Sequence, residues 1–357
     1  MVFNVEVCVD SVESASAAVR GGANRLELCG NIGIGGGTTP SMGLFKQIKR
    51  AAPNTPIMAM IRPRTGDFYY TFWEVDVMVE DIRAFKAAGA QGVVFGALDA
   101  YGKVDVRTTS RLVREALPME VCFHRAFDMA ENAEDAFSSI SHISGVTRIL
   151  TSGLGPKATS SDSLEVLKSL VQRSSSVAEG EHKISILPGS GINPGTVQGL
   201  LDALLPLGLQ EIHLSAGAWI PSAMRFRKQG MGMGVGGAGE WGIWRSSESV
   251  VHAVRQLVDA AVEKANQASQ VIDTTEESEE LAQETPAGGE ETLPEAEGAK
   301  YEAEGAAPEE EDGPAEVENV KAEVEDVTTE VEETQPEVEE GAKDDTEPVA
   351  VEKTDHE

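Results

Sequence analysis

Cysteine is scarce in this chain of 357 residues, which contains only Cys8, Cys29 and Cys122. So few cysteines in so long a chain do not make the disulfide framework of a small secreted protein, and we expect reduced thiols. No run of 18 apolar residues occurs, so no membrane-spanning helix is predicted. The first residues, MVFNVEV, lack a basic region and include a glutamate, unlike a signal peptide. We therefore expect a cytoplasmic protein with no membrane partner, and leave open whether it enters the nucleus.

Basic residues are also scarce, 29 against 60 acidic ones, and the imbalance lies at one end of the chain. Residues 271–357 hold 33 acidic and 4 basic side chains, a net charge of -29, which leaves 27 acidic and 25 basic ones for residues 1–270. A nucleic-acid-binding surface needs an excess of Lys and Arg to meet the phosphates. We therefore expect no nucleic-acid partner for the nearly neutral residues 1–270.

Aromatic side chains are absent from residues 271–357 apart from Tyr301, and the segment is rich in Glu, Pro, Gly, Ala and Thr. Such a segment buries too little apolar surface to offset the entropy lost on ordering it. We predict an acidic, low-complexity, disordered tail over 271–357. It acts as a solubilising segment or as a docking site for a basic partner, whose identity is unknown.

Residues 1–270 contain short apolar runs at regular spacing, which is typical of buried strands. The eight runs are Val5–Val9, Arg25–Cys29, Ile57–Arg62, Gly92–Gly96, Glu120–Arg125, Arg148–Ser152, Ile184–Leu187 and Glu211–Ser215. Amphipathic segments such as Ser11–Gly21 and Trp73–Ala88 separate them and predict helices. Eight strand–helix units of ~30 residues each predict an α/β fold, a (β/α)8 TIM barrel over residues 1–270. A doubly wound open sheet is the alternative.

Alternate residues of a barrel strand face opposite sides, and the side that meets the helices must be apolar. This condition turns an unusually polar, sulfur-rich set of side chains toward the barrel axis. The set is Glu6, Cys8, Glu27, Cys29, Met58, Met60, Arg62, Cys122, His124, His213 and Ser215. Most barrels fill this space with branched apolar residues. Because a buried carboxylate is costly unless it is paired, the departure needs an explanation.

A structural polar network is the first interpretation of these residues. In it, the two glutamates pair with arginines and the cysteines act as small apolar side chains. The expected pairs join Glu6 and Glu27 to Arg62 and Arg125.

A soft-metal site is the second interpretation. Cys8 and Cys29 end adjacent strands in the same phase, so we expect their sulfur atoms to lie near each other. Thiolate and thioether ligands select Cu(I), and histidine can assist them. The expected third ligand is Met58, Met60 or a histidine.

An active site at the carboxyl ends of the strands is the third interpretation, since TIM-barrel enzymes place their chemistry there. Arg62, Arg64 and Arg125 lie at or just past strand ends and would attract a carboxylate or phosphate. His124 is a candidate general acid or base, although a histidine satisfied within the core is the alternative. The candidates for proton transfer are His124, Asp128, Glu6 and Glu27.

Small residues follow the seventh and eighth strands, where barrels often bind phosphate. Backbone N–H groups in such loops approach an anion closely, although glycine that merely makes a tight turn is the alternative. The expected contacts are Gly189, Ser190, Gly191, Ser215 and Gly217.

Six segments occur in a characteristic order along roughly residues 3–268. They are RLELC at 25–29, GGTTPS at 36–41, IRPRTGDF at 61–68, FHRAFD at 123–128, RILTSG at 148–153 and HLSAGA at 213–218. Together they resemble the CutC family. The resemblance implies a TIM barrel, self-association into dimers or tetramers, and a role in copper homeostasis with Cu(I) binding. The family's copper-linked cysteines match Cys8 and Cys29.

Two positions and one longer stretch depart from the family pattern. Val9 stands where the family often has a second cysteine, Thr38 replaces a leucine, and the glycine-rich stretch at 230–242 is longer than usual. Two functions therefore remain in view. One is a Cu(I)-binding copper homeostasis protein, and the other is an enzyme acting on a small phosphorylated or carboxylated metabolite at the arginine-lined mouth.

Overall fold

The computed structural model describes residues 3–177 and 182–283, with 269–283 described by backbone alone. The chain divides into two units, Met1–Ala287 and Gly288–Glu357, and every described residue lies in the first. The tail predicted over 271–357 therefore lies outside the described residues from position 284 onward. In the described part of the chain, no helix is long and apolar enough to cross a bilayer.

Eight parallel strands form the central sheet. They are β1 (Asn4–Val9), β2 (Arg25–Leu28), β3 (Ile57–Met60), β4 (Gly92–Phe95), β5 (Glu120–Phe123), β6 (Val146–Thr151), β7 (Ser185–Pro188) and β8 (Glu211–Leu214). The order β7-β6-β5-β4-β3-β2-β1-β8 pairs the first strand with the last, and a parallel bridge between Gly189 and His213 links the remaining edges. The predicted (β/α)8 fold is thus confirmed as a nearly closed TIM barrel.

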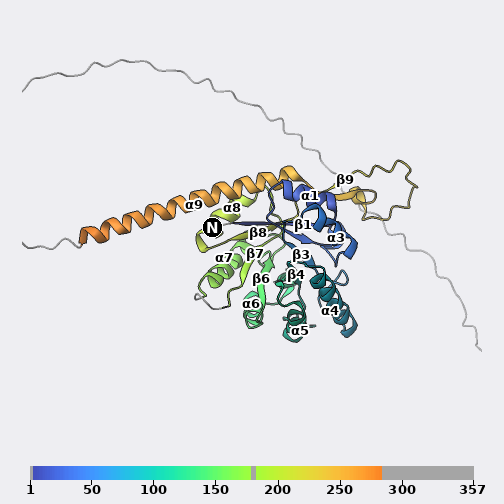
Figure 1. Ribbon diagram of the computed structural model, residues 1–357, viewed down its shortest axis with the longest axis horizontal. Coiled ribbons are helices and arrows are strands. Elements are labelled where there is room, and N and C mark those ends of the chain that lie inside the picture. The colour runs from blue at the N-terminus through green and yellow to red at the C-terminus, as the bar shows by residue number, and fades with distance from the viewer. Residues whose placement is uncertain (1–2, 178–181, 284–357) are drawn as a thin grey trace, which may run out of the picture. The chain divides into compact units, whose positions relative to one another are not determined.

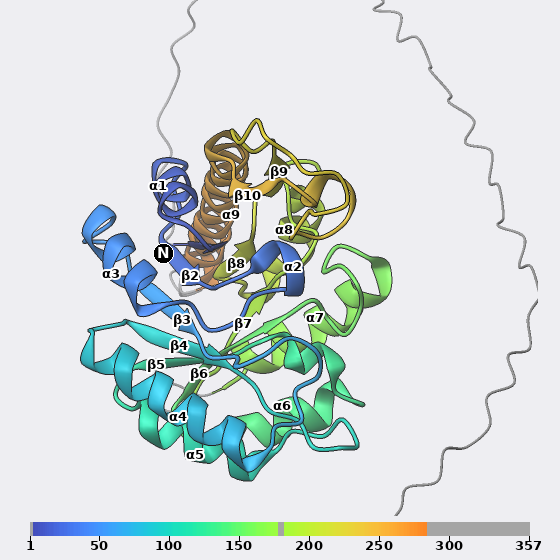
Figure 2. The same cartoon turned by 90° about the vertical axis from the view of Figure 1, so that its right-hand side faces the viewer.

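Helices surround the sheet on its outer side, with α4 beside α5 and α1 beside α9 (Figure 1, Figure 2). The helices are α1 (Val12–Arg20), α2 (Ile32–Gly35), α3 (Met42–Ala51), α4 (Phe72–Ala87), α5 (Val106–Ala116), α6 (Ala133–Ser141), α7 (Ser161–Ser175), α8 (Val197–Leu204) and α9 (Glu248–Gln283). Side-chain caps start several of them: Ser11 accepts from the Ser14 N–H at α1, and Thr71 and Glu74 form a capping box at α4. These caps satisfy backbone N–H groups that the helix itself leaves free.

Two separate apolar cores confirm the strand phase inferred from alternation. Outward-facing residues such as Val5, Val7 and Leu26 pack with the helices in the larger core. The smaller core fills the barrel and consists of Cys8, Cys29, Met58, Met60, Val94, Cys122, Leu150 and Leu187. Sulfur-bearing side chains therefore do face the barrel axis, where most barrels place branched aliphatic residues.

Several elements were not predicted. Helices α2 and α3 lie between β2 and β3, and an antiparallel hairpin of β9 (Gly217–Ile220) and β10 (Ile243–Ser246) follows β8. The rings of Trp219 and Trp244 pack edge to face in this hairpin, 5.5 Å apart between centroids. The last helix continues to Gln283, past the boundary at residue 270 that composition suggested. Ala, Glu and Gln are good helix formers, so helical backbone is compatible with the acidic composition there.

Candidate functional site

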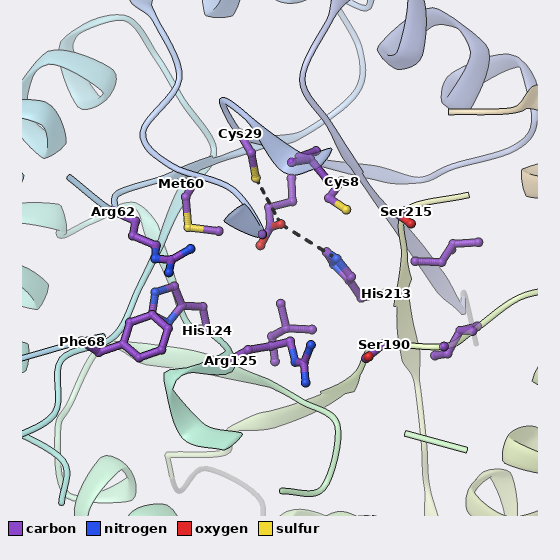
Figure 3. Close-up of a pocket in the computed structure, with 17 residues that line it drawn as sticks. Cys8, Cys29, Met60, Arg62, Phe68, His124, Arg125, Ser190, His213 and Ser215 are labelled. Atoms are coloured by element: carbon purple, nitrogen blue, oxygen red, sulfur yellow. Dashed lines mark hydrogen bonds and ion pairs between the residues drawn. The ribbon is translucent and has the colours of Figure 1, made fainter. Parts of the chain in front are cut away.

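A pocket of about 210 Å³ opens at the carboxyl ends of the barrel strands. Its lining includes three sulfur-bearing side chains, Cys8, Cys29 and Met60. The titratable lining residues are Glu27, Arg62, His124, Arg125 and His213. Figure 3 shows Cys8 and Cys29 on one side of the pocket and His124 and Arg125 on the opposite side. The pocket thus has a sulfur-bearing side and a nitrogen-bearing side, at the end of the barrel where ligands usually bind.

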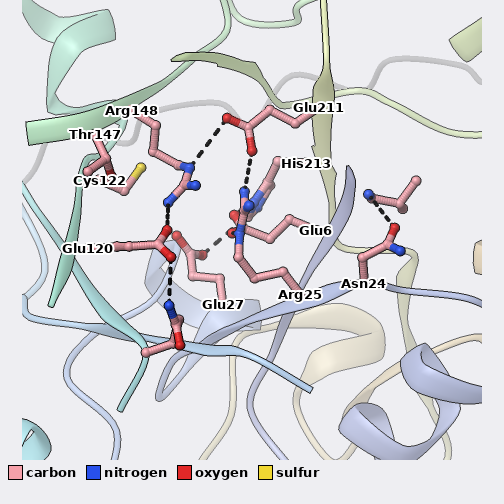
Figure 4. Close-up of polar contacts among 12 residues, drawn as sticks. Glu6, Asn24, Arg25, Glu27, Glu120, Cys122, Thr147, Arg148, Glu211 and His213 are labelled. Atoms are coloured by element: carbon pink, nitrogen blue, oxygen red, sulfur yellow. Dashed lines mark hydrogen bonds and ion pairs between the residues drawn. The ribbon is translucent and has the colours of Figure 1, made fainter. Parts of the chain in front are cut away.

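A chain of buried ion pairs lies beneath the pocket, toward the amino ends of the strands (Figure 4). Arg25 pairs with Glu6 and with Glu211, whose carboxylate oxygen lies 2.7 Å from Nη2. Glu211 also contacts Arg148, and Arg148 Nη1 lies 2.8 Å from Glu120 Oε2. The two guanidinium groups compensate carboxylates that would otherwise be buried without a partner.

The predicted structural network is therefore present, but with other arginines. Glu6 pairs with Arg25 and His213, and the expected pairs with Arg62 and Arg125 were wrong. The reason lies in the register, which sets Arg25 opposite Glu6 near the start of the strands. Arg62 and Arg125 follow the ends of their strands and lie at the mouth of the barrel instead.

The sulfur-bearing side of the pocket centres on the carboxyl group of Glu27. Cys29 Sγ donates to Glu27 Oε2 at 3.4 Å, and His213 Nε2 lies 3.9 Å from the same oxygen. Potential ligand atoms of Cys8, Glu27 and His213 all lie within 4.8 Å of one another. The other nitrogen of His213, Nδ1, lies 2.7 Å from Glu6 Oε1, which fixes the orientation of the ring. This buried group combines a thiol, a carboxyl and an imidazole, a donor set that can hold a metal ion.

Burial and charge set the protonation of these groups. Burial raises the pKa of Cys8, against an opposing effect of His213, and burial together with Glu27 raises the pKa of Cys29 well above its usual value. Burial would also raise the pKa of Glu6, but the charges of Arg25 and His213 lower it. Burial alone would lower the pKa of His213. Its acidic neighbours, of which Glu27 has the largest effect, instead raise that pKa well above the usual value. At neutral pH the site therefore holds protonated thiols next to a Glu6–His213 ion pair.

Two of the three arginines predicted to bind an anion already have carboxylate partners. Arg64 lies outside the pocket lining and pairs with Asp67 at 2.9 Å and with Glu74 at 2.5 Å. Arg125 lines the pocket, but its Nε lies 2.6 Å from Asp128 Oδ2. Their charges are thus partly neutralised before any ligand arrives.

Asp128 accepts hydrogen bonds from the segment at the end of β6 and does not line the pocket. Its carboxylate accepts hydrogen bonds from Thr151 Oγ1, from the Ser152 backbone N–H at 2.9 Å and from the Leu154 N–H at 3.3 Å. Among the described residues it makes no hydrogen bond to His124. Its carboxylate is therefore committed to other partners and does not orient His124.

His124 lies on the nitrogen-bearing side and is oriented by the backbone. Its Nδ1 accepts a hydrogen bond from the Ala126 N–H at 3.2 Å, so the proton of the neutral ring is on Nε2. No described residue accepts a hydrogen bond from Nε2, although that atom is buried. Burial, with the nearby charge of Arg62, lowers the pKa of His124 to about 3. The side chain is thus a neutral hydrogen-bond donor rather than a cation.

We expect His124 to stay neutral in the folded protein from about pH 8 down to about pH 4, because its pKa is lowered to about 3. Between pH 6.5 and 3 the unfolded chain binds a proton at this residue that the folded chain does not bind. Its contribution to stability is therefore complete above pH 6.5 and is lost on acidification, by about 1.4 kcal/mol per pH unit. Nitrogen-15 NMR of the imidazole ring, with a histidine peptide titrated in parallel, measures this directly. An imidazolium spectrum for His124 at pH 5.5 would contradict it.

The loops after β7 and β8 contribute only part of the predicted phosphate-binding set. Ser190, Gly191 and Ser215 line the pocket, whereas Gly189 and Gly217 do not. A Cβ atom at Gly189 would lie 2.7 Å from Leu150 and one at Gly217 would lie 2.3 Å from Trp244, so these two glycines make room for neighbouring side chains. Ser190 has a φ of 82°, a left-handed conformation that is costly for a non-glycine residue. Such strain at a pocket wall is a feature that function often maintains.

The charged residues beneath the pocket and the aromatic ring of Phe68 at the pocket were not among the predicted site residues. The signal for the first group was available. Arg25, Glu120, Arg148 and Glu211 all begin or lie near the start of a strand, in the phase that faces the axis. A charged side chain at such a position requires a partner across the barrel.

Comparisons with known proteins identify close relatives. The sequence model of the CutC family matches residues 3–218, a span that contains all eight barrel strands. A CutC family protein of Chromobacterium violaceum is 40% identical over 257 residues, which cover 72% of this chain and 98% of that protein. A copper homeostasis protein cutC homolog of Mus musculus is 43% identical over 65% of this chain and 80% of its own length. The solved CutC structure of Streptococcus agalactiae, at 25% identity, has a TM-score of 0.54 and is 98% covered by 60% of this chain.

Proposed function

This chain belongs to the CutC family, and we propose that it serves copper homeostasis by binding Cu(I) in the cytosol through cysteine thiolates. Its mouse and human relatives are named copper homeostasis protein cutC homologs. One observation carries the proposal. Side chains of Cys8, Cys29 and Met60, from three adjacent strands or strand ends, reach the same pocket.

The chemistry of the donors fits Cu(I). Thiolates and thioethers are soft ligands that select Cu(I), whereas a carboxylate suits harder ions. Cys8 and Cys29 are free of disulfides and would supply two thiolates, and Met60 would supply a thioether. Met58 belongs to the same apolar cluster but does not line the pocket, so of the two candidate methionines we propose Met60.

One charge close to Cys8, that of His213, opposes the effect of burial and favours a thiolate at this residue. Two thiolates and one Cu(I) ion leave a net negative charge, and His213, held as an imidazolium by Glu27 and Glu6, lies close to Cys8. A nearby cation stabilises a thiolate. We propose that Glu6 and His213 act as the outer partners of the copper site, in the way that carboxylate–histidine pairs support metal ligands elsewhere.

Cu(I) affinity should rise with pH, because burial raises the pKa of both Cys8 and Cys29 and each thiol must lose its proton to bind the ion. Linkage predicts a change of about tenfold per pH unit for each thiol proton released. Competition titrations against a Cu(I) chelator at about pH 6, 7 and 8, corrected for the chelator's own protonation, measure the slope.

A flat pH profile would show that no buried thiol is deprotonated on binding, and would contradict coordination by Cys8 and Cys29. Proton release can also be measured independently, by titrating copper into a weakly buffered solution that contains a pH indicator. Agreement between the number of protons released and the slope of the affinity supports the proposed ligand set.

A further inference from the structure

Arg62 is a buried cation without a carboxylate partner. Its residue is 7% exposed, and its Nη atoms donate to the backbone carbonyls of Gly35, Gly37 and Gly66 at 2.6 to 3.0 Å. Those carbonyls carry no full charge, and no ion pair to Arg62 occurs among the described residues. The third donor, Nε, is buried and has no hydrogen-bond partner there. An uncompensated guanidinium with an unused donor is costly in a protein interior unless an anion joins it.

A second unused donor lies on the same side of the pocket. His124 is 3% exposed, and its protonated Nε2 is buried without a partner in the described part of the chain. Figure 3 shows the side chains of Arg62 and His124 next to each other, and both lie against the ring of Phe68. Both residues line the pocket. A cationic N–H and a neutral N–H side by side match the two oxygens of one carboxylate group.

The ring of Phe68 contacts both donors. It lies 5.0 Å from the Arg62 guanidinium carbon and 4.9 Å from the His124 ring, centroid to centroid. Both unused nitrogens are buried. Because the Phe68 ring packs against both side chains, we expect this ring to turn aside when a ligand reaches them. Phe68 belongs to the segment between β3 and α4, which Arg64 ties to Glu74.

The pocket also has an apolar part of its lining. Leu150 and Ile192 contribute to it, together with Phe68. Arg125 and Arg64 are committed to their own carboxylates, so Arg62 is the arginine whose charge is left to a ligand. A ligand that satisfies these surroundings has one anionic group and a small apolar body.

We propose that the pocket binds a small organic monocarboxylate, whose two oxygens accept hydrogen bonds from Arg62 Nε and His124 Nε2 and whose apolar part packs against Leu150 and Ile192. This site is separate from the copper ligands: it uses the nitrogen-bearing side of the pocket and none of the sulfur atoms. If the protein is also an enzyme that acts in this pocket, the proposed site predicts that its substrate is a carboxylate rather than a phosphate ester.

The test uses the copper-free full-length chain and 3-methylbutanoate as the probe, with its neutral amide and inorganic phosphate as comparison ligands. Isothermal titration calorimetry should detect the carboxylate and show at least tenfold weaker binding of the amide. Arg62→Gln and His124→Phe should each weaken the carboxylate at least tenfold. Arg83→Gln removes the same charge on the surface, away from the pocket and from the segment that carries Phe68, and should leave binding unchanged. The Phe68→Ala variant should bind 3-methylbutanoate faster in stopped-flow fluorescence, because the ring that packs against Arg62 and His124 is removed.

Three outcomes would overturn the proposal: equal binding of the amide and the carboxylate, equal losses in Arg83→Gln and the pocket variants, or binding of phosphate alone. Arg62 also holds two loops through backbone carbonyls, so its loss could disturb the fold. The binding result of Arg62→Gln is used only if the circular dichroism spectrum of the variant matches that of the parent chain. If the spectra differ, the binding result of His124→Phe alone tests the proposal. The Cys8→Ser, Cys29→Ser double variant should still bind the carboxylate, so failure of the copper site and failure of this site are distinguishable.

Discussion

Cu(I) affinity should fall by more than about 100-fold when Cys8 and Cys29 are both replaced by serine. Loss of an outer partner alone costs about 10- to 100-fold in metal affinity, and this change removes two direct ligands. It leaves hydroxyl groups, which are poor ligands for a soft ion. Serine is close to cysteine in size, so the pocket should keep its shape. Competition titration against a Cu(I) chelator at fixed pH measures the effect.

Cys122→Ser is the matched control for this experiment. Cys122 faces the barrel axis and belongs to the same buried apolar cluster, but it does not line the pocket. The same chemical change there should reduce stability without changing copper affinity. An undiminished affinity in the double variant, or an equal loss in Cys122→Ser, would refute coordination by the two pocket cysteines.

Replacement of Arg25 by methionine should lower the free energy of unfolding by about 3–5 kcal/mol, the usual cost of removing one partner from a buried ion pair. Arg25 bonds to both Glu6 and Glu211, and all three side chains are nearly inaccessible to solvent. Methionine fills most of the volume, so the loss reports the uncompensated carboxylates rather than a cavity. Urea unfolding followed by tryptophan fluorescence gives the difference.

Arg83→Met is the appropriate control. Arg83 pairs with Glu80 and Glu115 on the surface, and such exposed pairs contribute about 0–1 kcal/mol. Loss of Arg25 should also weaken copper binding indirectly, because Glu6 would then no longer be held in place to orient His213. If Arg25→Met costs no more than Arg83→Met, the buried network does not stabilise the barrel and its role must be sought in the site alone.

The two proposals divide one pocket by chemistry. Its sulfur-bearing side offers Cys8, Cys29 and Met60, with His213 as a supporting charge, and suits a soft cation. Its nitrogen-bearing side offers two unused donors, on Arg62 and His124, and suits an oxyanion. The earlier alternatives of a copper site and an arginine-lined binding site therefore do not compete for the same atoms.

Local sequence patterns were enough to predict the fold and the direction in which the strand side chains point. Strand spacing predicted the eight-stranded barrel, and alternation placed Glu6, Cys8, Glu27 and Cys29 toward its axis, where the structure has them. The hairpin of β9 and β10 was missed because its aromatic pair, Trp219 and Trp244, is separated by a long glycine-rich stretch. Pairing across such a distance leaves no periodic signal in the sequence.

What the sequence by itself determined is the alternation of strand and helix, the phase of each strand and the segregation of negative charge in residues 271–357. Those properties are local, because a side chain's direction follows from its position along its own strand. Only the tertiary structure decided which charges meet. The register between β1 and β8 sets His213 opposite Glu6, although 207 positions separate them. Tertiary structure likewise sets Arg62 against the backbone carbonyls of Gly35 and Gly37, 27 and 25 positions away, whereas the pair of Arg125 with Asp128 is local, three positions apart.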